Sequence, residues 1–185
     1  MNNIIRTVGI IFILLTIHSC SGIKVSEDYE QGYDFSALKT FTWKPNENNE
    51  YGITDNDLLD KRIRSAIQNS LLAKNYIQID SGVPDFFISY NVTVEQKISN
   101  SNVSGGISLG RSSAGRYGSI GISTGSRARV YNQGTLLIDV TDTVNNKLVW
   151  RGIGAQSVSE YPDSEKTTAL INETVEKLLS QFPPE

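Results

Sequence analysis

The chain has 185 residues, enough for one globular domain with its own core but short of a comfortable two. Its formal net charge of −3 excludes general nucleic-acid binding, which needs a basic surface. The only histidine is His18 and the only cysteine is Cys20, both near the N-terminus. The rest of the chain lacks the residues of zinc sites, Ser-His-Asp triads and Cys-His pairs. We therefore expect no metal, no cofactor and no enzyme, with carboxylate-only chemistry as the open exception.

The N-terminal segment is typical of an export signal. Arg6 supplies one positive charge, and residues 7–17 form a largely apolar run. A membrane-spanning helix needs about 20 such residues, so this run suits the core of a signal peptide. The Ile-His-Ser-Cys sequence that ends at Cys20 resembles a bacterial lipobox, although its histidine replaces the usual small or aliphatic residue. We predict that residues 1–19 are a lipoprotein signal peptide, cleaved between Ser19 and Cys20, and that Cys20 is lipidated.

Lipidation would hold the mature protein on a membrane through Cys20. A thioether-linked diacylglycerol plus an acylated N-terminus exceeds the two signals that stable anchoring needs. Ser21 and Gly22 resemble the outer-membrane-sorted class of lipoproteins, so we expect an outer-membrane protein that faces the periplasm. Residues 20–33, largely polar, are predicted to be a lipidated N-terminus and tether. The alternative is an ordinary secretory peptide, which would leave Cys20 as an unpaired thiol in an oxidising compartment.

Strands and a helix are predicted in the first half of the domain. Residues 39–43 alternate in polarity, as a strand does. Thr54 and Asp57 form a capping box before a run of apolar residues at helical spacing, and Asn75 is the predicted end of this helix. A short strand follows. Residues 86–98, whose even positions are mainly apolar, then predict the longest strand, with one face on a core.

Residues 100–133 are rich in glycine and serine. Brief apolar alternations predict two weak strands joined by a flexible tip, and no phosphate-binding loop motif occurs here. Between Glu95 and Asp139 the chain has no acidic residue. The arginines of this stretch are candidate anion-binding residues, because guanidinium groups donate paired hydrogen bonds to phosphate and carboxylate. They are Arg111, Arg116, Arg127 and Arg129. The alternative is that these arginines only keep a glycine-rich loop soluble.

The C-terminal part predicts a hairpin and a second helix. Residues 135–141 and 147–158 read as its two strands, and Pro162 and Asp163 open an amphipathic helix that two prolines end. Both helices need a partner surface. The sequence therefore predicts an α+β fold, in which two helices pack on one face of an antiparallel sheet as a two-layer sandwich with a glycine-rich flexible hairpin. We assign residues 34–185 to this single domain.

Three carboxylates and three aromatic residues remain as site candidates. The carboxylates could form the paired groups of a glycosidase, although such residues on alternating strands usually mark the solvated face. They are Glu95, Asp139 and Asp142. The aromatic residues could line a ligand groove, but their apolar strand positions favour core packing. They are Trp43, Tyr90 and Trp150.

Four blocks of the chain, at residues 34–43, 84–92, 134–142 and 147–152, resemble the bacterial lipoprotein family called domain of unknown function 4136. The glycine-rich interruption and the closing amphipathic helix are similar too, although here the interruption holds serine and arginine where many relatives have more aromatic residues. The resemblance implies an envelope lipoprotein without an established activity. It supplies no catalytic residues.

Two classes of function remain. The first is a membrane-anchored, non-catalytic interaction module that docks another envelope protein or an anionic envelope polymer. The alternative is a carrier of a small ligand or lipid, which would use a cavity between the sheet and the helices.

Overall fold

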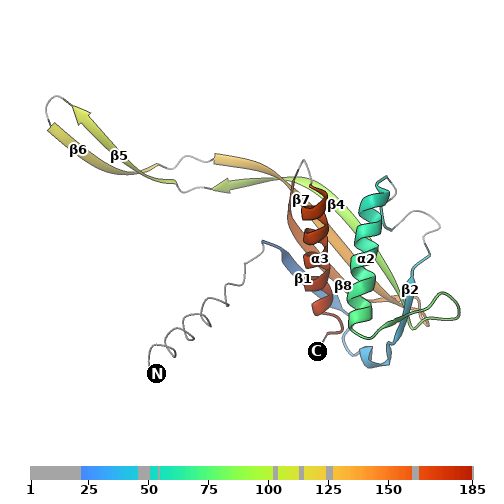
Figure 1. Cartoon of the computed structure of the whole chain (residues 1–185). Helices are drawn as coiled ribbons and strands as arrows, with labels where there is room; N and C mark the ends of the chain where they lie inside the picture. Colours follow the sequence, from blue (N-terminus) through green and yellow to red (C-terminus); the bar gives the residue numbers. More distant parts are fainter. Residues whose placement is uncertain are drawn as a thin grey trace, which may run out of the picture.

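The computed structural model describes residues 22–45, 51–53, 55–101, 104–112, 115–123, 127–159 and 163–184. In chain order its elements are β1 (Lys24–Tyr29), the short 3-10 helix η1 (Phe35–Ala37), β2 (Thr40–Trp43), α2 (Asp57–Ala73), β3 (Ile77–Gln78), β4 (Phe86–Ser101), β5 (Ser104–Ser112), β6 (Gly115–Ser123), β7 (Arg127–Asp142), β8 (Lys147–Val158) and α3 (Ser164–Ser180). Figure 1 shows their arrangement.

The main sheet joins strands from both ends of the chain, in the order β1-β8-β7-β4-β2-β3. It is mostly antiparallel, as the sequence predicted, but β2 pairs parallel with both β3 and β4. The parallel edge has a topological cause. After β2 the chain passes through α2 and returns to the same sheet, and such a crossover makes the flanking strands parallel.

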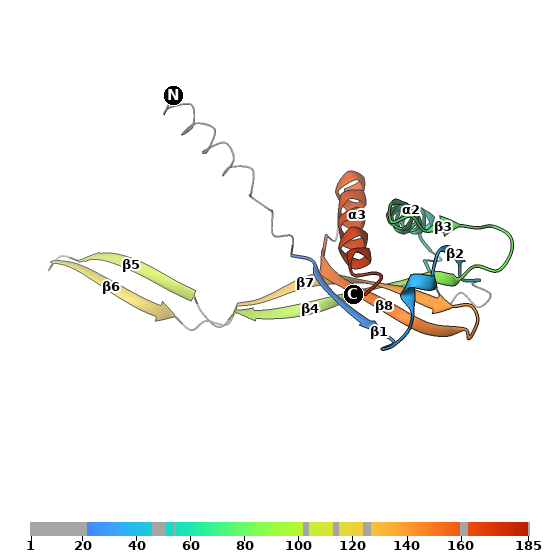
Figure 2. The same ribbon diagram turned by 90° about the horizontal axis from the view of Figure 1, so that it is seen from below.

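Both helices pack on one face of this sheet, as the two views in Figures 1 and 2 show. The predicted α+β two-layer fold is therefore confirmed. Alternate residues of the strands and one stripe of each helix meet in the core, as the pleat and the helical repeat require. Its fully buried side chains include Phe41, Ile67, Leu71, Phe86, Ile88, Tyr90, Ile138, Trp150, Leu178 and Phe182.

Helix α2 begins at Asp57, directly after its N-cap residue Asn56. The Asn56 side chain accepts a hydrogen bond from the Leu59 N–H at 3.1 Å, so Asn56 is the N-cap and the predicted capping box at Thr54 and Asp57 is wrong. The predicted stop is confirmed: Asn75 has a φ of 67°, the left-handed conformation in which helices commonly end. Within the described residues, neither helix has the length and apolar character needed to cross a bilayer.

Residues 24–29 were expected to lie in a tether, but they form β1, an edge strand paired antiparallel with β8. On β1, Val25 packs against the core, and Glu27 accepts a hydrogen bond from the Trp150 indole N–H at 2.9 Å. An edge strand with one core residue needs few apolar side chains. The segment is therefore polar enough to resemble a tether. The tether prediction is wrong for these six residues.

Strands β4 and β7 extend well past the helices. They pair antiparallel from Phe86 opposite Asp142 to Ser101 opposite Arg127. Beyond them β5 and β6 form a separate two-stranded sheet. We call this pair, together with residues 95–101 of β4 and 127–133 of β7, the arm, which extends to one side in Figure 1. β5 and β6 are the two weak strands predicted in the glycine-rich stretch, whereas β7 begins earlier than expected, at Arg127.

Candidate functional site

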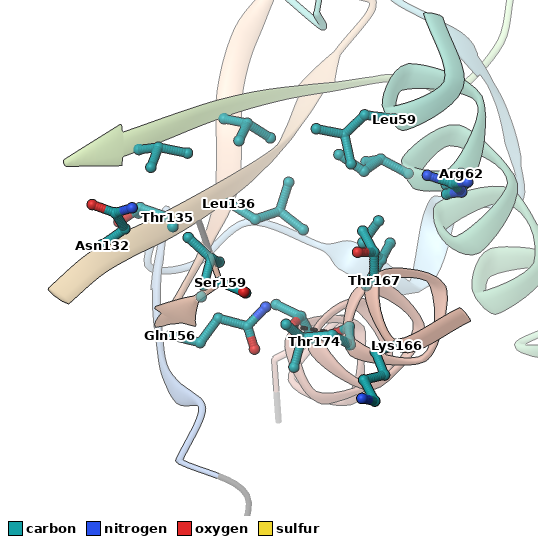
Figure 3. A pocket seen from close by; sticks show the side chains of 18 of the residues that line it. Leu59, Arg62, Asn132, Thr135, Leu136, Gln156, Ser159, Lys166, Thr167 and Thr174 are labelled. Atoms are coloured by element: carbon teal, nitrogen blue, oxygen red, sulfur yellow. Dashed lines mark hydrogen bonds between the residues drawn. The ribbon is translucent and has the colours of Figure 1, made fainter. Parts of the chain in front are cut away.

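A groove of about 630 Å³ lies between the sheet and the first turns of both helices. Figure 3 shows side chains of α2, α3 and the sheet around this hollow, with Leu136 on the sheet side and Leu59 on α2. Most of its wall is aliphatic, with side chains from five elements. They include Leu59, Ile63, Val94, Leu136, Val158 and Ile171.

The groove exists because β4 and β7 extend beyond the first turns of the helices. Val94 lies on the helix-facing side of β4, yet its side chain is 62% exposed because no helix covers it. Glycines at 134 and 154 line the groove from β7 and β8. A Cβ at Gly134 would lie 2.8 Å from Cγ1 of Val158, so Val158 folds over that glycine. A Cβ at Gly154 would likewise lie 2.9 Å from Cγ2 of Thr174, so the two glycines let Val158 and α3 pack directly on the strand backbone.

The rim of the groove is polar. The Arg62 guanidinium donates to the Ser164 hydroxyl at 2.6 Å and so joins the start of α3 to α2. Asp163 caps α3 by accepting hydrogen bonds from the N–H groups of Glu165 and Lys166, at 2.9 and 3.0 Å. The Gln156 side-chain oxygen is buried at the wall and accepts no hydrogen bond from the residues that the structure describes. An apolar interior with a polar rim suits an amphipathic molecule.

The aromatic candidates lie outside this groove. Trp150 and Tyr90 are fully buried in the core, which confirms the packing interpretation. Trp43 is partly buried, and the Arg64 guanidinium lies 4.5 Å from the centre of its ring.

A polar cluster that the sequence did not predict ties α2 to the sheet. The Tyr90 hydroxyl donates to Asp60, and Asp60 also accepts a hydrogen bond from Arg64 at 2.9 Å. Burial, and then the hydrogen bond to Asp60, raise the pKa of the Tyr90 phenol far above its ordinary value. In the sequence, only the i, i+4 spacing of Asp60 and Arg64 indicates an ion pair. Nothing in the sequence indicates that Tyr90 contacts this pair.

The structure keeps the three candidate carboxylates apart. Asp139 forms a two-bond ion pair with Arg151, at 2.7 Å for each bond. Asp142 accepts hydrogen bonds from the turn that follows it, including the Asn145 N–H at 3.1 Å. Glu95 pairs with Lys97 at 2.6 Å, and this hydrogen bond lowers the pKa of Glu95. Asp139 lies opposite Ser89, six residues from Glu95 along β4 and hence about 20 Å away, which is too far for a glycosidase pair.

The candidate arginines fall on the arm in two groups. Arg111 and Arg116 are directly opposite each other on β5 and β6. Arg127 and Arg129 lie on β7, paired with Ser101 and Ser99 of β4. Strand pairing therefore brings Arg111 opposite Arg116, whereas Arg127 and Arg129 pair with serines. Ser19 and Cys20 lie outside the described residues.

Among the described residues, no group of three histidine, cysteine, aspartate or glutamate side chains could hold a metal ion.

The chain was compared with known families, curated proteins and solved structures. The family profile described as "Domain of unknown function (DUF4136)" matches residues 25–184. No curated protein matches. A PDZ domain protein from Parabacteroides distasonis is similar in fold, with a TM-score of 0.55 and 14% identity, covering 88% of this chain and 36% of that one. This chain thus spans about a third of that protein. Two crystal forms of the PelC dodecamer from Paraburkholderia phytofirmans give TM-scores of 0.43 and 0.44 at 13% and 10% identity, covering 84% and 85% of this chain and 96% and 95% of theirs.

Proposed function

Since the chain belongs to the DUF4136 family, which is described only as a domain of unknown function, we propose a function from the geometry: a membrane-anchored envelope lipoprotein whose non-catalytic domain binds the apolar chain of a small amphipathic ligand or lipid. The observation that carries this proposal is the aliphatic groove between the sheet and the two helix starts.

The size and lining of the groove support the proposal. Small-molecule sites in proteins are mostly apolar hollows of about 300–1,000 Å³ with a few polar groups that orient the ligand, and a volume of about 630 Å³ lies in this range. Such groups are Arg62 and Lys166 at the rim and Gln156 at the wall. An apolar chain would lie against Val94 and Leu136, and the ligand's polar end would lie at the rim.

The chemistry of the domain supports a role without catalysis. Beyond Cys20 the chain has neither histidine nor cysteine, so nucleophile and base pairs built on them are not available. The candidate carboxylates are each engaged in an ion pair or a turn. Screening the purified protein against hydrolase substrates, with and without divalent metals, should give no turnover. Robust turnover that is lost on changing one carboxylate would contradict this.

Anchoring through Cys20 is tested separately from ligand binding. Cells given a radiolabelled fatty acid should incorporate it into the full chain, and Cys20→Ser should abolish the label and release the protein from membranes. A serine variant that keeps both label and membrane attachment would contradict lipidation. Fractionation should place the wild-type protein in the outer membrane, protected from protease added to intact cells.

The groove is tested with two matched valines. Val94 and Val130 are 62% and 61% exposed and point to the same side of neighbouring strands, but only Val94 lines the groove. A soluble protein beginning at Ser21 should bind a fluorescent fatty acid saturably. Val94→Glu should weaken binding about tenfold or more, because a carboxylate must lose water to contact an apolar chain, and about 1.4 kcal/mol corresponds to tenfold. Val130→Glu should bind like the parent.

Absence of saturable binding by the parent protein, or equal loss in both valine variants, would reject the groove as the site. The interaction module is then the remaining proposal. Crosslinking in cells followed by purification separates the two, because a carrier should copurify with lipid, whereas an interaction module should copurify with a specific envelope protein.

A further inference from the structure

We infer that, when the lipidated protein is in water, the groove holds an acyl chain attached to the protein's own Cys20. This rests on the proposed function twice, since Cys20 must be lipidated and the groove must accept an apolar chain. The inference adds what fills the groove: an acyl chain that is covalently attached to the same protein molecule.

The start of β1 lies beside the wall of the groove. Lys24, its first residue, is paired with Ala155 of β8. Gln156 and Val158 of β8, and Ser159 directly after that strand, line the groove. Figure 2 shows the start of β1 next to the end of β8, on the α3 side of the sheet.

The direction of β1 also favours this occupant. Because β1 and β8 are antiparallel, the chain upstream of Lys24 leaves the sheet at the end toward which β8 runs, where Ser159 lies. Cys20 is four positions before Lys24, and four residue steps span at most about 14 Å. A Cβ on Gly22 would meet no atom of the described residues within 4 Å. A lipid on Cys20 is therefore held within reach of the groove.

The chemistry of both partners fits this arrangement. An acyl chain is neutral and apolar, like the groove wall formed by Val94, Leu136 and Val158, and burying both removes apolar surface from water. A bilayer interior is as apolar as an aliphatic protein surface, so the acyl chain can move from the groove into a membrane with little driving force against the transfer. The groove would cover the anchor in water and release it at a bilayer.

The first test compares the full chain with and without its lipid. Wild-type protein made in cells and its Cys20→Ser variant are transferred to detergent-free buffer, and the monomeric fractions are titrated with a fluorescent fatty acid. The unlipidated variant should bind saturably, and the lipidated protein should bind at least tenfold more weakly because its groove is filled. Equal binding by both would reject the inference but leave the proposed function standing. Binding by neither would reject the proposed function itself.

The second test locates the acyl chain directly. Cells are fed a photoreactive fatty acid, and the purified lipidated monomer is irradiated and analysed by peptide mass spectrometry. Crosslinks within one chain should fall on groove residues of β8 and α3. Val94→Glu should reduce these crosslinks several-fold, and Val130→Glu should leave them unchanged. Crosslinks confined to other surfaces, or formed only between chains, would overturn the inference.

Discussion

The indole ring of Trp150 lies directly against the α-carbon of Gly152, two residues further along β8. A Cβ on residue 152 would come within 2.5 Å of the far edge of that ring. Trp150 is fully buried and packs at 5.2 Å from the ring of Phe182, so it cannot swing away without disturbing the core. Residue 152 is glycine because the largest side chain of the core occupies the space beside it.

Gly152→Ala should therefore destabilise the domain by about 1–3 kcal/mol, the usual cost of overpacking a core. Urea unfolding followed by tryptophan fluorescence measures this as a lower midpoint with an unchanged slope. Gly22→Ala is the matched control, because a Cβ there meets nothing within 4 Å. If both variants unfold at the same urea concentration, the contact with Trp150 does not constrain residue 152.

Tyr90→Phe should also destabilise the domain, by about 1–3 kcal/mol, because it removes the hydroxyl that donates to Asp60 and leaves a part-buried carboxylate with fewer donors. The measurement is again the free energy of unfolding. Tyr131→Phe is the control, since Tyr131 is 36% exposed and lies on the arm. Equal stability of the two variants would show that the bond between α2 and β4 contributes little.

Asp85 should make stability depend on acid pH. Burial acts to raise the pKa of its carboxyl, but hydrogen bonds from the N–H groups of Thr40 and Lys39 and from the Thr40 hydroxyl outweigh burial, so the pKa lies below its usual value. A lowered pKa contributes stability above the unfolded-state value of about 3.9, and this contribution is lost as the pH falls through the folded-state pKa.

Asp85→Asn should accordingly be less stable than the parent at pH 7, and the difference should shrink as the pH falls below about 4. Unfolding by urea at a series of pH values measures this. Asp80→Asn, at an exposed position in the same stretch of chain, serves as the control. A constant difference for Asp85→Asn across the acid range would contradict the assignment.

The arm should bind anionic surfaces if its arginines act as predicted. A soluble protein beginning at Ser21 should bind anionic vesicles and lipopolysaccharide at low salt and more weakly at physiological salt, with each basic residue worth roughly 1 kcal/mol near such a surface. Changing the four arginines to glutamine should abolish this: Arg111, Arg116, Arg127 and Arg129. Four lysines outside the arm, changed likewise, are the charge-matched control: Lys39, Lys44, Lys61 and Lys147. Equal loss in both sets would indicate nonspecific attraction, and no binding by the parent protein would remove the hypothesis.

The helices and the long strands could be predicted because their apolar spacing is local. Ile63, Ile67 and Leu71 form one stripe of α2, and each of them is buried as that stripe requires. Strand β1 could not be predicted, because its single core residue, Val25, gives no periodic signal and its pairing partner is remote in the chain. The parallel pairing of β2 likewise depends on where the chain returns after α2.

The groove could not be predicted for a related reason. Val94 and Val158 have the same alternating pattern as core residues, and nothing local shows that the helices begin too late to cover them. The predicted cavity between sheet and helices was a general expectation for this layered fold. Its position depends on the offset between the ends of the helices and the ends of the strands, which only the assembled fold defines.

The pairing of β1 with β8 fixes an order of events during synthesis. Glu27 and Trp150 are hydrogen-bonded across 123 residues of sequence, and β1 has no other neighbour in the sheet. A chain emerges N-terminus first, and contacts between distant segments form late because a long loop must close. β1 therefore has no strand to pair with until β8 has emerged. Any enzyme that acts on the N-terminus before then meets β1 unpaired, and β8 completes the attachment of β1 to the sheet.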